Sequence, residues 1–151
     1  MNSYAAPPVN HHTSYLLNGK LLEWSGARAE VRSPILTGDA GDKKGALLGS
    51  APDMDEASAL EALDSARKAY DFGRGFWPTA EAGVRIAAME KFIELIIPRR
   101  EEVVNLLMWE ICKKRSDAEK EFDRTVIYLN ETVAEYKNLH REGSHITSVS
   151  G

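Results

Sequence analysis

The sequence predicts an α+β fold, in which a small N-terminal antiparallel β-hairpin or sheet is followed by about four α-helices. Two observations support this class. Short apolar runs before residue 53 are separated by Gly, Asp and Pro, which is typical of strands joined by turns. From residue 53 onward, apolar residues recur every three or four positions, which is typical of amphipathic helices. This change of period marks the boundary between the two parts.

A clear turn signal predicts the hairpin. Two short apolar runs in residues 15–24 flank the dipeptide Asn18-Gly19. Both central residues of a type I′ turn need a positive φ, which Asn and Gly adopt most readily. Residues 15–24 are therefore expected to form two antiparallel strands.

The remaining strands are predicted from alternation and proline. Residues 1–14 contain two prolines and small polar residues and predict a flexible N-terminal arm. Residues 28–33 alternate and predict a further strand that ends at Pro34, because proline cannot donate a hydrogen bond to a ladder. Residues 46–50 predict one more short strand.

Two helices follow. Asp53 and Glu56 form a capping-box pattern at the start of the first helix, and Gly73 supplies its C-terminal stop. The second helix is expected to begin near Thr79 and to end or kink at Pro98.

Two more helices complete the predicted domain, which covers residues 15–143. The third runs from about residue 100 to 111, and the fourth begins at Ser116 with Glu119 three positions later and ends near His140. Residues 144–151 predict a connecting strand or a disordered tail. The apolar faces predict the core, which includes Leu60, Leu63, Val84, Met89, Phe92, Ile93, Leu106, Leu107, Phe122, Val126 and Leu129.

Composition excludes several classes of partner. The net charge is −4 and 43% of the residues are hydrophobic, so the chain suits one domain and offers no basic surface for nucleic acid or an anionic membrane. The N-terminus has no basic start followed by an apolar core, and no apolar run approaches the roughly 20 residues that span a bilayer. A single cysteine, Cys112, excludes an intrachain disulfide. These features predict a cytoplasmic protein.

Cys112 could be a nucleophile, but the sequence favours a partly buried thiol at a helix end. The negative end of the helix dipole disfavours a thiolate there, although Lys113 and Lys114 act in the opposite direction. None of the four histidines is near it in the sequence.

Two other patterns carry little functional signal. The pairs His11-His12 and His140/His145 lack the i, i+4 spacing of a helical zinc site. The GRGFWP segment, residues 73–78, lacks the lysine and the hydroxyl of a phosphate-binding loop, so a helix stop and a turn are favoured.

Arg124 lies off the predicted core face of the fourth helix, about 200° from Phe122 around the axis. Glu121, three positions earlier, is close enough for an ion pair. From the residues alone, an exposed i, i+3 ion pair between Arg124 and Glu121 is expected.

Four segments together resemble a known family. They are LNGK at 17–20, ARKAYDFGRGFWPT at 66–79, LLMWEICKK at 106–114 and AEKEFDRTV at 118–126. Their order resembles the N-terminal part of aldehyde dehydrogenases, and most of all the NADP-dependent, non-phosphorylating glyceraldehyde-3-phosphate dehydrogenases. The resemblance covers about residues 15–142.

The resemblance implies that the chain is an N-terminal fragment of an oxidoreductase several times longer. The parent would oxidise glyceraldehyde-3-phosphate to 3-phosphoglycerate with NADP, using a cysteine nucleophile and a glutamate base that lie beyond this chain. The parent is expected to be a homo-oligomer, and the chain alone is expected to bind no cofactor and to be inactive. The alternative is a free-standing, non-enzymatic helical module that associates with itself or with a full-length dehydrogenase.

The resemblance assigns roles to three positions. Arg124 matches an arginine that binds the substrate phosphate. Glu110, with the backbone carbonyl around Val31, matches a site for a structural monovalent cation. Cys112 stands where the family usually has a glycine, and a left-handed backbone there would cost a cysteine about 1 kcal/mol.

Overall fold

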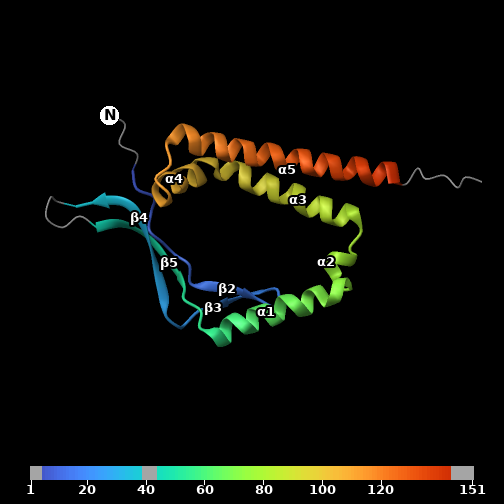
Figure 1. Ribbon diagram of the computed structural model, residues 1–151, viewed down its shortest axis with the longest axis horizontal. Helices are drawn as coiled ribbons and strands as arrows, with labels where there is room; N and C mark the ends of the chain where they lie inside the picture. The colour runs from blue at the N-terminus through green and yellow to red at the C-terminus, as the bar shows by residue number, and fades with distance from the viewer. Residues whose placement is uncertain (1–4, 39–43, 144–151) are drawn as a thin grey trace, which may run out of the picture.

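The computed structural model of the chain describes residues 5–38 and 44–143 and confirms the predicted α+β class. Strands come first and helices follow, as Figure 1 shows. The predicted segment 144–151 lies outside the described residues. The strands are β1 Asn10–His11, β2 Ser14–Leu17, β3 Lys20–Glu23, β4 Arg28–Thr37 and β5 Lys44–Pro52.

The predicted hairpin is present as β2 and β3. The two strands pair antiparallel, and Leu17 opposite Lys20 closes the turn. Asn18 and Gly19 both have positive φ, 50° and 73°, as a type I′ turn requires.

A second sheet has the strand order β1-β5-β4, with β4 and β5 antiparallel and β1 parallel to β5. Residues 10–11, inside the predicted arm, are thus held in a sheet. Close approach of β1 requires Gly49, because a Cβ atom there would overlap the carbonyl oxygen of Asn10.

The prediction that the strand ends at Pro34 was wrong. β4 continues to Thr37, and its register shifts between Arg32 and Leu36, around the proline. The irregularity places Pro34 where no ladder hydrogen bond is needed from its nitrogen.

The four predicted helices are present, together with a short fifth. They are α1 Glu56–Tyr70, α2 Phe76–Thr79, α3 Ala82–Ile96, α4 Arg100–Glu110 and α5 Arg115–Gly143, with 3₁₀ turns at Asp71–Gly73 and Ile97–Arg99. Pro98 lies in the turn that separates α3 from α4, as predicted.

Two predicted helix boundaries need correction. The N-cap of α1 is Asp55 rather than Asp53, and the carboxylate of Asp55 accepts a hydrogen bond of 2.8 Å from the backbone N–H of Ser58. At the other end, Asp71 already adopts the left-handed conformation, with φ 42°, two residues before Gly73.

The best-formed core lies between α4 and α5. Val104 and Ala118 are completely buried, and Phe122 packs with them. α3 also packs along α5, and the two helices run side by side in Figure 1. None of the helices in the described part of the chain is both long enough and apolar enough to cross a membrane.

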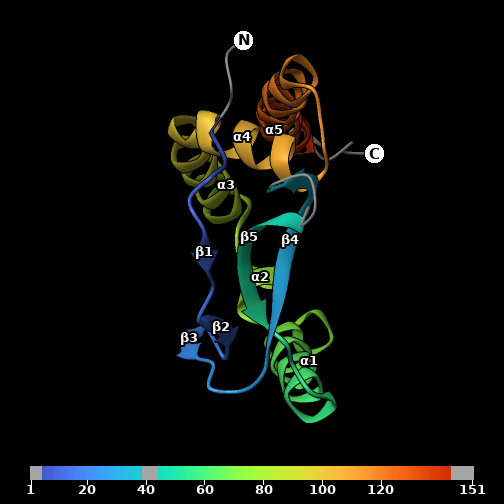
Figure 2. The same cartoon turned by 90° about the vertical axis from the view of Figure 1, so that its left-hand side faces the viewer.

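The predicted core was too large. α1 has no buried residue, and Leu60 and Leu63 are 56% and 64% exposed. Val84 and Phe92 on α3 are also exposed. In both views α1 lies with β2 and β3 at the end of the molecule away from α5, so the apolar stripe of α1 has few neighbours. Figure 2 shows β4 and β5 connecting the two ends.

The core between α4 and α5 predicts different effects for two valine-to-alanine substitutions. V104A removes two methyl groups from a fully buried site and should lower the free energy of unfolding by about 2 kcal/mol. V84A, on the exposed face of α3, should change it by less than about 0.5 kcal/mol. Urea denaturation followed by circular dichroism measures both, and equal losses would contradict the assignment of the core.

Candidate functional site

The candidate site is built where β4, the end of α4 and the start of α5 meet. The buried hydroxyl of Ser33, on β4, donates a hydrogen bond to the backbone carbonyl of Trp109 on α4. The same hydroxyl accepts a hydrogen bond of 3.0 Å from the backbone N–H of Ile35. Through these bonds the sheet fixes the last turn of α4.

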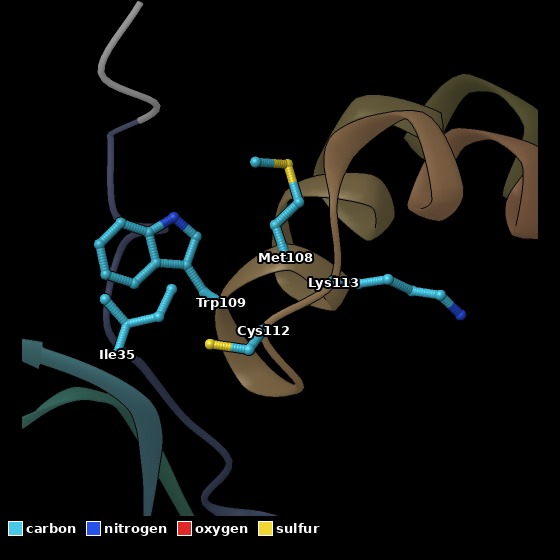
Figure 3. Close-up of a pocket in the computed structure, with 5 residues that line it drawn as sticks. All are labelled: Ile35, Met108, Trp109, Cys112 and Lys113. Atoms are coloured by element: carbon cyan, nitrogen blue, oxygen red, sulfur yellow. The ribbon is translucent and has the colours of Figure 1, made fainter.

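The chain then reverses at Cys112, whose φ of 57° is left-handed. This confirms the prediction made from the glycine usual at this position. The thiol is exposed rather than partly buried. It lines a cavity of about 240 Å³ and points toward Ile35 and Trp109, as Figure 3 shows. No histidine lines this cavity, so no base for a nucleophilic Cys112 is found there.

Ion pairs join α4, which precedes this reversal, to α5, which follows it. Arg100 donates hydrogen bonds of 2.8 and 2.9 Å to the two carboxylate oxygens of Asp123. Arg115 contacts both Glu119, at 2.8 Å, and Glu101. The guanidiniums of Arg100 and Arg115 hold the pKa values of Asp123 and Glu101, respectively, below their usual range.

Arg124 lines an open recess of about 320 Å³ on the first turns of α5. In the described residues its guanidinium makes no hydrogen bond or ion pair. The expected ion pair with Glu121 is absent, because Glu121 binds the ammonium of Lys113 instead. The recess is lined by Lys113, Asp117, Lys120, Glu121, Arg124, Thr125 and Tyr128.

The sequence interpretation missed the two lysines of this recess. Lys120 lies four positions before Arg124, a spacing that places both cations on one side of a helix. Lys113 comes from the loop before α5, so no periodicity within the helix could have found it. The recess gathers three cations and two carboxylates at its surface, and a guanidinium fork matches the oxygens of a phosphate.

Glu110 and Val31 also come together, as the cation hypothesis requires. Both line a second cavity of about 290 Å³, beside Gly49 and Ser50 of β5. Across the described residues there is no group of three or more His, Cys, Asp or Glu side chains able to hold a metal.

The described histidines show no sign of acting as metal ligands. His11 and the hydroxyl of Ser50 share a hydrogen bond of 2.8 Å between β1 and β5, which gives His11 a structural role. His140 lies on α5, and His145 lies outside the described residues.

Two comparisons find related proteins. Residues 39–150, most of the chain, match the sequence profile of the aldehyde dehydrogenase family. A solved structure, the NAD-dependent aldehyde dehydrogenase from Sinorhizobium meliloti, has the same fold with a TM-score of 0.71 and 23% sequence identity. That match covers 89% of this chain and 25% of the other, so this chain spans about a quarter of that protein. A search of curated proteins found no significant match.

The left-handed turn predicts a stabilising substitution. C112G should raise the free energy of unfolding by about 0.5–1 kcal/mol, because glycine adopts a positive φ without steric cost. C112S should stay near the wild-type value, which separates backbone strain from loss of the thiol. Chemical denaturation measures both, and a destabilised C112G would contradict the backbone assignment.

Proposed function

Because the chain belongs to the aldehyde dehydrogenase family, we propose that it is the N-terminal part of a longer aldehyde dehydrogenase. The match to about a quarter of a solved member supports this proposal. The segment would form the first strands and helices of the cofactor-binding domain.

We further propose that the parent is an NADP-dependent, non-phosphorylating enzyme that oxidises glyceraldehyde-3-phosphate to 3-phosphoglycerate. The observation that carries this proposal is the exposed guanidinium of Arg124, which has no partner in the described residues and lies beside Lys113 and Lys120. A guanidinium binds a phosphate through two parallel hydrogen bonds, and the lysines add positive charge at the same surface.

In this proposal, Arg124 holds the phosphate end of the substrate and so fixes how far the aldehyde reaches into the active site. Positioning of this kind lowers the entropy lost on reaching the transition state. When bound, the nicotinamide would accept a hydride from the oxidised carbon. The described residues do not fit that cofactor. In their larger sheet β4 and β5 are antiparallel and only the two-residue β1 pairs parallel to β5, whereas a dinucleotide site needs successive parallel strands joined through a glycine turn and a helix.

A structural role is proposed for Glu110. Glu110 and Val31 line one cavity, and a carboxylate and a backbone carbonyl are oxygen donors of the kind that suit a hard monovalent cation. Such a cation would hold β4 to the end of α4, close to the turn that leads to Arg124.

The parent is also proposed to be a cytoplasmic homo-oligomer that contacts neither nucleic acid nor a membrane. The net charge of −4 supports only the last part of this proposal, since it gives no general attraction to polyanions. The alternative is a free-standing helical module, which should bury its apolar faces; the exposure of Leu60 and Leu63 on α1 therefore favours the longer enzyme.

The phosphate role of Arg124 predicts a change in substrate preference. In the active parent, R124A should raise KM for glyceraldehyde-3-phosphate about ten-fold or more, because charge-assisted hydrogen bonds to the phosphate are lost. KM for unphosphorylated glyceraldehyde should change little.

Steady-state kinetics with both aldehydes measure this preference. R67A is the matched control, since Arg67 is an exposed arginine on α1 that pairs with Asp64. Equal increases in KM for the two aldehydes would remove Arg124 from the phosphate site.

A further inference from the structure

Arg124 lacks the partner that its own helix offers. Glu121 lies three positions before it, at a spacing that favours an ion pair on a helix surface. In the structure the carboxylate of Glu121 binds the ammonium of Lys113, and Arg124 makes no ion pair in the described residues. All three side chains line the same recess.

The left-handed backbone at Cys112 determines where the side chain of Lys113 starts. This residue directly follows Cys112, whose left-handed conformation ends α4 and reverses the chain toward α5. In Figure 3 the Lys113 side chain extends away from the thiol of Cys112. The side chain of Lys113 is 30% exposed and that of Glu121 is 45% exposed, so the pair is partly shielded from water.

Competition for Glu121 follows from these positions. If Lys113 were absent, Arg124, which lies three positions after Glu121 on α5, would be the cation placed to pair with Glu121. An incoming phosphate would then have to displace a carboxylate from the guanidinium, and the charge of Glu121 would repel it. With Lys113 in place, the charge of Glu121 is compensated before any ligand arrives.

We propose that Lys113 is a positioning residue that holds Glu121 and thereby keeps the guanidinium of Arg124 available for a phosphate. The part of this inference that concerns phosphate binding, its ligand half, rests on the proposed function. Lys113 acts through Glu121, not through direct contact with the anion. Asp117, the second carboxylate of the recess, and Lys120 lie on the first turns of α5.

A measurement without ligand tests the ion-pair exchange. In NMR spectra of the 151-residue chain, the Nε–Hε signal of Arg124 should shift in K113A and exchange more slowly with water, because Glu121 then binds it. The double variant K113A/E121Q should return both properties to wild-type values, and K113R should leave them unchanged. An unchanged Arg124 signal in K113A, or a change that persists in the double variant, would overturn the proposal.

Titration with inorganic phosphate tests the consequence for binding. The apparent affinity at Arg124 should fall about two- to five-fold in K113A, which is the scale of an exposed ion pair. It should recover in K113A/E121Q. If it stays low in the double variant, Lys113 contacts phosphate directly and the positioning role is wrong. The matched control is K114A, because Lys114 does not line the recess.

The two experiments separate this inference from the proposed function. If phosphate leaves Arg124 unchanged in the wild-type chain, the phosphate role of Arg124 fails, and with it the ligand half of the inference. The Arg124 signal in K113A then still decides whether Lys113 controls its partner. If phosphate binds the wild-type chain and K113A binds it equally well, the proposed function stands and the role of Lys113 is overturned.

Discussion

The close contact between α4 and α5 is the constraint on which the rest of this structure depends. It is made by Val104 and Ala118, which are completely buried, and by Phe122 one turn further along α5. The small side chain of Ala118 lets the two helices approach, and the reversal at Cys112 brings them into register. The Arg100–Asp123 pair then fixes their rotation with a bidentate contact at the surface. Lys113 lies in the loop that joins α4 to α5, and Arg124 lies on α5. The packing of α5 against α4 therefore also determines where the cations of the recess meet.

The other end of the molecule is built differently. α1 has no buried residue, and in both views it lies with the β2–β3 hairpin, away from the core between α4 and α5. Its exposed leucines form the kind of surface that proteins cover with further structure. A chain that spans about a quarter of a known aldehyde dehydrogenase is expected to have such surfaces, and this supports the proposal that it belongs to a longer enzyme.

Local chemistry explains which features could be predicted from the sequence. The Asn18-Gly19 turn depends on the backbone of two residues and was predicted correctly from them. The left-handed Cys112 was expected from the glycine that the resembling family usually has there, and it too is present. The continuation of β4 past Pro34 depends on a register shift against β5, which no single segment encodes. The core was overestimated because periodicity identifies an apolar face but not whether a partner covers it. The Lys113–Glu121 pair was missed for a related reason: spacing within α5 favoured Arg124 as the partner, and the competing cation comes from the preceding loop.

We propose that this chain is the part of an aldehyde dehydrogenase that presents the guanidinium of Arg124 to a phosphorylated substrate, with the redox chemistry elsewhere in the polypeptide. The most direct test is the intact mass of the native polypeptide that contains this sequence in its source cell. A single species several times heavier than 16.8 kDa is expected. A native species of 16.8 kDa would contradict it, and the chain would then be a free-standing module.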